Sequence, residues 1–108
     1  MQNTPGDPLF EVDTPLGFRV RVGRAHWEFI IRVKHPAMAG REVDVQAALS
    51  EPDEVRRSRV DTNVLLFYKV AGTRRWVCAV CRQLNGDGFL ITAYPTDVIK
   101  EGDRIWPA

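Results

Sequence analysis

The strand predicted near the C-terminus combines an apolar face with a row of hydroxyl groups. Successive side chains of a strand point to opposite faces, so Thr92, Tyr94 and Thr96 share one face. The other face is apolar and is formed by Phe89, Ile91 and Ala93. A sheet with this pattern packs against a core on one side and has a polar surface on the other. We therefore predict a functional site on the hydroxyl-bearing face, although threonine and tyrosine are also ordinary strand formers.

His35 is the residue best suited to proton transfer. It lies at the predicted end of a helix, beside Lys34 and near Arg32, and it precedes Pro36. Cationic neighbours disfavour a charged imidazole, and a neutral histidine can act as a general base. A histidine at this position can instead cap the last carbonyls of the helix. Both interpretations stay open, and spacing alone favours the cap.

The densest basic cluster of the chain is Arg56, Arg57 and Arg59, with Ser58 between them and Asp61 shortly after. In a strand Arg57 and Arg59 share one face. A guanidinium group suits a phosphate or the charge that develops on it. An exposed edge strand is also commonly protected by charge alone, so the two interpretations are evenly balanced.

Polar residues on neighbouring predicted strands complete the set of candidates: Tyr68, Lys69 and Arg82. Together with His35 and Arg57 they supply an acid, a base and a cation without any metal ion. The tryptophans are assigned to packing rather than to base stacking and are Trp27, Trp76 and Trp106.

Cys78 and Cys81 form a CxxC pair, which in other contexts binds metal or performs redox chemistry. An offset of three residues places the two sulfurs on opposite faces of a strand. A zinc site also needs two further ligands, and the chain offers only His26 and His35 in addition to the cysteines. We therefore interpret the cysteines as buried structural residues and expect no metal site.

The apolar periodicity and the turn residues predict the elements that position these side chains. A β-hairpin is expected over 9–12 and 18–22, and helices over 24–34 and 40–49, the second with Val43, Ala47 and Ala48 on its inner side. Strands are expected over 54–59, 64–70, 76–82 and 88–94. The prediction is an α+β fold in which two N-terminal helices pack on one face of a four-stranded antiparallel β-meander, preceded by the hairpin.

Length and composition indicate one domain in a reducing compartment. The chain has 108 residues, 44% of them hydrophobic, and a net charge of +1. Residues 1–8 are predicted to be a flexible lead-in and residues 9–108 a single domain. No apolar run is long enough to span a membrane and no secretion signal is evident, so we expect a cytoplasmic protein with no membrane partner.

A family resemblance follows from the order and spacing of short motifs between Ala25 and Trp106. The motifs are Trp27-Glu28-Phe29-Ile30, His35-Pro36, Glu51-Pro52-Asp53-Glu54-Val55, Ser58, Asp61, Tyr68, Gly88-Phe89-Leu90-Ile91-Thr92-Ala93-Tyr94, Ile99-Lys100-Glu101-Gly102 and Trp106. In this order they resemble small bacterial and phage proteins assigned to the barnase, EndoU, tRNA-cleaving colicin and RelE superfamily of metal-independent ribonucleases.

The resemblance implies an endoribonuclease, of toxin or phage-effector type, in which the ribose 2′-OH attacks the adjacent phosphate. It implies His35 as base or acid, Arg57 or Arg59 as phosphate stabiliser, and Thr92 and Tyr94 as positioning or proton-donating groups. The catalytic candidates are thus His35, Arg57, Thr92 and Tyr94. The substrate-binding candidates are Ser58, Arg59, Asp61, Lys69 and Arg82.

The implied partners are RNA and a cognate inhibitor or antitoxin protein, and no cofactor is implied. A net charge near zero gives only weak electrostatic attraction to RNA, which favours a substrate presented on a ribosome or a tRNA. The alternative is a non-catalytic RNA- or protein-binding module of the same fold, whose polar side chains are tied into structural hydrogen bonds. A regulator that pairs an exposed edge strand with a partner is a third reading.

Overall fold

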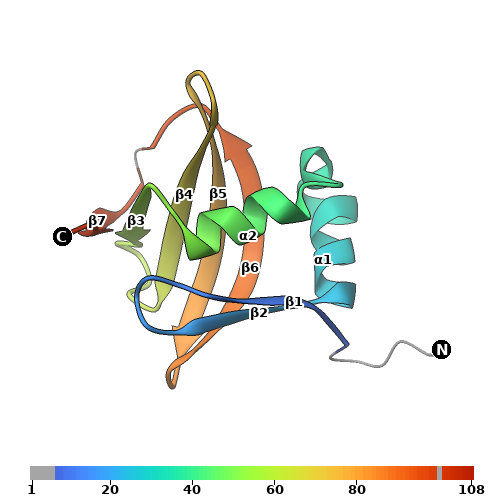
Figure 1. Cartoon of the computed structure of the whole chain (residues 1–108), viewed down its shortest axis with the longest axis horizontal. Coiled ribbons are helices and arrows are strands. Elements are labelled where there is room, and N and C mark those ends of the chain that lie inside the picture. Colours follow the sequence, from blue (N-terminus) through green and yellow to red (C-terminus); the bar gives the residue numbers. More distant parts are fainter. Residues whose placement is uncertain (1–6, 100) are drawn as a thin grey trace.

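Seven strands form one mixed β-sheet in the order β1-β2-β6-β5-β4-β3-β7, shown in Figure 1. The computed structural model describes residues 7–99 and 101–108. The strands are β1 (Pro8–Asp13), β2 (Arg19–Gly23), β3 (Glu54–Arg57), β4 (Val64–Gly72), β5 (Arg75–Leu84), β6 (Asp87–Thr96) and β7 (Asp103–Trp106). The helical segments are α1 (Arg24–Phe29), the π-helical turn η1 (Ile30–Lys34), the 3₁₀ turn η2 (Pro36–Met38) and α2 (Glu42–Ser50).

The predicted arrangement of two helices on a four-stranded meander is wrong, because the sheet is larger and mixed. The hairpin β1–β2 does not merely precede the meander: β2 runs parallel to β6 through three residue pairs, from Arg19↔Asp87 to Arg21↔Phe89. Gly88 permits this close joint, since a Cβ atom there would lie 2.6 Å from the Phe18 ring. At the opposite edge the short strand β7 pairs with β3 and was not predicted.

The predicted lead-in, residues 1–8, falls mainly on residues 1–6, which lie outside the described residues. Pro8 begins β1, and the carbonyl oxygen of Asp7 accepts a hydrogen bond of 3.0 Å from the backbone N–H of Arg24. The hairpin is therefore anchored to the start of α1.

The first helical segment begins as an α-helix and ends as a π-helical turn. The backbone N–H of His35 donates to the carbonyl oxygen of Ile30 at 2.7 Å, which closes this wider turn. Pro36 then starts the separate 3₁₀ turn η2. In Figure 1 the segment stands beside β6, and the His26 ring nitrogen Nε2 lies 3.1 Å from the carbonyl oxygen of Ile91 on that strand.

Helix α2 crosses the sheet in front of β4 and β5 (Figure 1). Val45, Ala48 and Leu49 are buried on its inner side. Val43 is 76% exposed, so its predicted place in the core is wrong. The helix begins at Glu42 rather than at Gly40, and its core positions follow the spacing i, i+3, i+4 from Val45.

The two faces of the sheet carry separate apolar clusters. The main core lies between α2 and the sheet and includes Val55, Leu65, Phe67, Val77, Ala79, Cys81, Leu90 and Ala93. The cluster on the opposite face consists of Leu66, Tyr68 and Cys78, with Trp76, Val80, Tyr94 and Ile99 packed against it. The two free cysteines thus lie on opposite faces, as the strand pattern predicted.

An irregularity in the pairing of β5 with β6 changes the predicted face of Phe89. The register moves from Val80↔Thr92 to Cys81↔Leu90, so Ile91 is an extra residue on β6. Leu90 is buried in the core, while Phe89 is 46% exposed. Simple alternation places Phe89 on the core face, and the bulge is the reason that this prediction is wrong.

No helix among residues 7–99 and 101–108 has the length and apolar character needed to cross a membrane.

Candidate functional site

A cavity of about 420 Å³ opens on the sheet face opposite α2. Its lining residues come from four distant parts of the chain and are His35, Ser58, Val64, Leu66, Val80, Thr92, Tyr94 and Glu101. The four polar candidates His35, Ser58, Thr92 and Tyr94 are thereby brought to one place. We call this space the His35 cavity.

His35 reaches the cavity because its helix packs alongside β6. The ring centroids of His35 and Tyr94 are 5.5 Å apart, with the planes tilted by 41°. The π-helical turn and Pro36 end the helix at this residue, so its half-buried side chain projects to the hydroxyl-bearing face. The imidazole therefore lies where it can exchange a proton with a molecule bound in the cavity.

Tyr94 is a neutral hydrogen-bond donor in this setting. Burial, followed by the neighbouring Cys78 thiol, raises the pKa of Tyr94 above its usual value of 10. Burial raises the pKa of Tyr68 in the same way. Both phenols therefore keep their protons at neutral pH, and Tyr94 can donate a hydrogen bond to an anion in the cavity.

Thr92 supplies a buried hydroxyl that has no hydrogen-bond partner among the described residues. Thr92 lies two residues before Tyr94 in a regularly paired part of β6, so the two side chains share one face of the sheet. A buried hydroxyl without a partner is costly, by about 1–3 kcal/mol. Such groups are uncommon, and here the hydroxyl belongs to a residue that lines a cavity.

Glu101 is the polar residue of the cavity to which the sequence alone assigned no role, although it belongs to one of the motifs of the family resemblance. It lines the His35 cavity, and its charge contributes to the raised pKa values of Tyr68, Cys78 and Tyr94. Its position is fixed by the next residue, Gly102, whose φ of +81° belongs to the left-handed region. An acidic residue directly before a glycine and a short strand was the available signal.

A second cavity, of about 410 Å³, adjoins the first. Ser58, Leu66 and Glu101 line both cavities. The remaining lining residues of the second are Arg59, Val60 and Gly102. The two cavities form one groove, with His35 near one end and Arg59 near the other, and we call it the His35–Arg59 groove.

The arginines of β3 and its following turn do not enter the His35 cavity. Arg57 shares its strand face with the buried Val55, and its Nη1 donates to the carbonyl oxygen of Thr62 at 2.6 Å. Arg59 forms an ion pair of 2.8 Å with Asp103 at the far end of the groove, and both side chains are largely exposed. Of the two arginines, Arg59 alone lines the groove.

The other substrate-binding candidates are engaged in structural contacts. Lys69 Nζ donates to the carbonyl oxygen of Glu51 at 2.7 Å, away from the groove. Arg82 pairs with Asp61 at 2.8 Å, and it is the cross-strand neighbour of Val64, which lines the His35 cavity. The Asn63 backbone N–H and then Arg82 hold the pKa of Asp61 below its usual value.

Ser58 begins a tight turn at the place where the two cavities of the groove meet. Its Oγ accepts hydrogen bonds from the backbone N–H groups of Val60 at 3.1 Å and Asp61 at 3.3 Å. The hydroxyl hydrogen is still free to point to a molecule in the groove.

Comparison of the chain with protein-family models, with curated proteins and with solved structures gave no match. Within the described part of the chain, no three His, Cys, Asp or Glu side chains lie together as metal ligands. The arrangement of His35, Tyr94, Thr92 and Glu101 is suited to proton transfer around a bound anion.

Proposed function

We propose that the chain is a cytoplasmic, metal-independent endoribonuclease that cleaves single-stranded RNA in the His35–Arg59 groove. One observation carries the proposal: His35, Ser58 and the pair Thr92 and Tyr94, from three separate parts of the sequence, line a single cavity together with Glu101. An imidazole and a carboxylate can serve as the acid and the base of phosphodiester transesterification, and neutral hydroxyl donors can form hydrogen bonds to the phosphate oxygens.

The proposed reaction divides proton transfer between Glu101 and His35. Glu101 accepts the proton of the ribose 2′-OH while O2′ forms a bond to phosphorus. His35 donates a proton to O5′ as the P–O5′ bond breaks. The products are a 2′,3′-cyclic phosphate and a 5′-hydroxyl end.

Tyr94 and Thr92 are placed to stabilise the phosphate during this reaction. A neutral phenol donates a hydrogen bond to a non-bridging oxygen as negative charge develops on it, and the Thr92 hydroxyl has no competing partner among the described residues. Arg59, which lines the far end of the groove, supplies a guanidinium group there when it exchanges its exposed partner Asp103 for a phosphate.

The test is cleavage of total RNA by the purified protein with EDTA present throughout. We expect His35→Ala, Glu101→Gln and Tyr94→Phe each to reduce cleavage by roughly a hundredfold or more. Glu28→Gln is the matched control for Glu101→Gln, because Glu28 is an exposed residue of α1 that does not line the groove. Failure of the folded wild type to cleave any RNA would contradict the proposal, as would equal activity of the Glu101 and Glu28 variants.

A second function is supported by the engaged basic side chains. Arg57, Lys69 and Arg82 are tied to Thr62, Glu51 and Asp61 respectively, which is what a non-catalytic module of this shape predicts. Such a module binds RNA or a protein in the groove without cleaving it. Tight RNA binding by a wild type that leaves the RNA intact would favour this function.

A further inference from the structure

A third cavity lies at the free end of the β4–β5 hairpin and has a volume of about 530 Å³. Its lining residues are Thr73, Arg74, Arg75, Pro95, Thr96 and Asp97. The lining thus includes two arginines and one aspartate, which together carry a formal charge of +1. We call it the hairpin cavity.

The backbone of Arg74 has a conformation that is more common for glycine and asparagine than for arginine. Gly72 pairs with Arg75, so Thr73 and Arg74 form a two-residue turn. The φ of Arg74 is +54°, in the left-handed region where glycine or asparagine is preferred. A residue with a strained backbone that also lines a cavity is a candidate for a functional side chain.

The guanidinium groups of this cavity are not engaged by acidic partners. None of the ion pairs found among the described residues includes Arg74 or Arg75, and both residues are exposed. This contrasts with Arg59 and Arg82, which pair with Asp103 and Asp61. Free, planar guanidinium groups are suited to bind phosphate oxygens in pairs.

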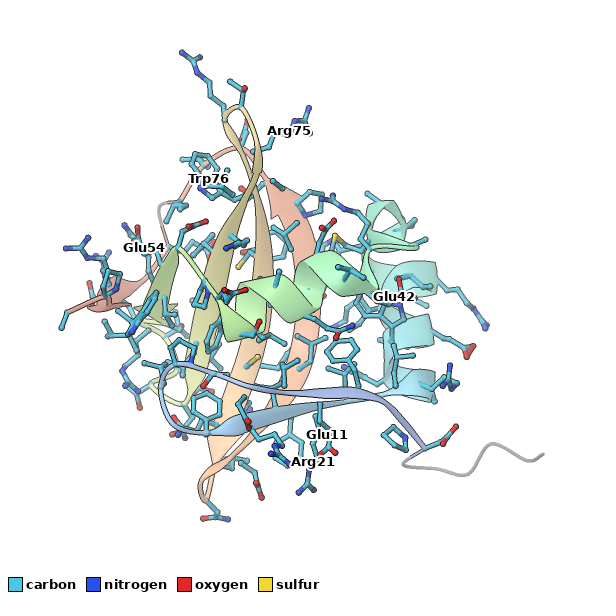
Figure 2. The ribbon with its side chains drawn as sticks, viewed as in Figure 1. Glu11, Arg21, Glu42, Glu54, Arg75 and Trp76 are labelled. Atoms are coloured by element: carbon cyan, nitrogen blue, oxygen red, sulfur yellow. The ribbon has the colours of Figure 1, made fainter. Side chains whose placement is uncertain are left out.

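The hairpin cavity follows the His35 cavity along β6. Tyr94 lines the first, and Pro95 and Thr96 line the second. Thr92 and Thr96 are four strand residues apart, a span of about 13 Å. Figure 2 shows Arg75 at the free end of the hairpin, and the neighbouring Trp76 pairs with Thr96.

We propose that the hairpin cavity is a phosphate-binding subsite for the RNA strand that enters the His35 cavity. The inference rests on the proposed function for the identity of the ligand: a single-stranded RNA long enough to place one phosphate at the His35 cavity and another at Arg74 and Arg75. The hydroxyl of Thr73 supplies a further donor to that second phosphate.

The test uses the double variant Arg74→Asn/Arg75→Gln, in which asparagine tolerates the left-handed turn. Its matched control is Arg32→Gln/Arg104→Gln, which removes the same charge from two exposed arginines outside the three cavities. The probe is a fluorescent eight-nucleotide 2′-O-methyl oligoribonucleotide, which has no free 2′-OH and cannot be cleaved by the proposed reaction. Binding is measured from 50 to 200 mM salt, and cleavage of a ribodinucleotide is measured in parallel.

We expect the hairpin variant to bind the octamer roughly tenfold more weakly than the control does, because two charge-assisted contacts are lost. The slope of log affinity against log salt should fall by about 1.4, which corresponds to two lost charges on a single strand. Cleavage of the dinucleotide, which is too short to reach the hairpin, should be unchanged.

Equal octamer binding and equal salt slopes for the two double variants would overturn the subsite. Loss of octamer binding in a protein that cleaves nothing would keep the subsite and remove the proposed nuclease activity.

Discussion

Cys78 is a thiol enclosed on the sheet face opposite α2, beside the two buried tyrosines. Burial raises the pKa of Cys78 from 9.0 to about 12. The unfolded chain therefore loses this proton above about pH 9, while the folded chain holds it up to about pH 12. Ionisation favours the unfolded state throughout this range, so the free energy of unfolding should fall as the pH rises from 9 to 12.

Cys78→Ala should make this pH dependence less steep. With one fewer thiol titrating, the loss should be smaller by about 1.4 kcal/mol per pH unit near the middle of the range. The measurement is urea unfolding at a series of pH values from 8 to 12. Parallel curves for the wild type and the variant would show that Cys78 ionises as easily in the folded chain as in the unfolded one.

We expect the Thr92 hydroxyl to lower the stability of the fold while it contributes to cleavage. Thr92→Val removes a buried hydroxyl without a partner among the described residues, so we expect the free energy of unfolding to rise by about 1 kcal/mol. If the hydroxyl contacts the phosphate, cleavage falls in the same variant. Thr14→Val is the control: the buried Thr14 hydroxyl donates to the carbonyl oxygen of Phe18 at 2.9 Å, and its loss should lower stability by about 1 kcal/mol. Urea unfolding and RNA cleavage measured on both variants check the prediction, and a destabilised Thr92→Val would contradict it.

At the scale of elements, the turn before β7 depends on Gly102. Its φ is +81°, and a Cβ atom there would lie 2.5 Å from the carbonyl oxygen of Arg57 on β3. We expect Gly102→Ala to lower the free energy of unfolding by about 3 kcal/mol, from backbone strain and overpacking together. The same variant should displace Glu101 and reduce cleavage.

Gly86→Ala separates the two causes. Gly86 has a φ of +85°, but a Cβ atom there would meet nothing within 4 Å. Its substitution should therefore carry the backbone strain alone, about 1 kcal/mol. Equal destabilisation of the two variants in urea unfolding would show that the contact with Arg57 is relieved by movement of β7.

Helix α2 provides a further contrast between two of its apolar residues. Leu49 is fully buried in the core, and Leu49→Ala should lower the free energy of unfolding by about 3 kcal/mol. Val43→Ala on the same helix should change it by less than about 0.5 kcal/mol, because Val43 is exposed. Thermal or urea unfolding of the two variants decides this, and a large effect at Val43 would place it against a partner surface.

At the scale of the whole molecule, the hairpin and the meander share one core. Phe18, the residue directly before β2, is buried, and its ring meets that of Phe67 on β4 with centroids 6.3 Å apart. We expect Phe18→Ala to lower the free energy of unfolding of the entire domain by about 3 kcal/mol. Far-ultraviolet circular dichroism and tryptophan fluorescence should still report one coincident transition. Two separate transitions would mean that the hairpin unfolds independently.

Local patterns predicted most of the elements but not their assembly. The strands of the meander follow from alternation and from glycine-bearing turns, which act over a few residues. The joint of β2 with β6 links residues about seventy positions apart in the sequence, and no local pattern marks such a pairing. Strand β7 has only four residues, and the bulge at Ile91 reverses the alternation that placed Phe89 in the core.

The site shows the same division between local and distant information. Thr92 and Tyr94 could be placed on one face because they lie two residues apart on one strand. That His35 and Ser58 join them depends on how the helices and β3 pack, which the spacing of residues does not encode. Arg57 and Lys69 could not be excluded in advance, since their contacts with Thr62 and Glu51 are made through backbone carbonyl groups.

The docking of the first helical segment beside β6 has a consequence for self-association. Strand β2 covers β6 only from Asp87 to Phe89, so the rest of that strand would present unpaired backbone groups in the middle of the sheet. The segment that ends in His35 packs along this gap, and His26 meets the carbonyl oxygen of Ile91 there. The element that delivers the histidine to the cavity therefore also shields an edge on which another chain could add a strand. A substitution that weakens the packing of this segment against β6 would therefore promote aggregation and disable the site together.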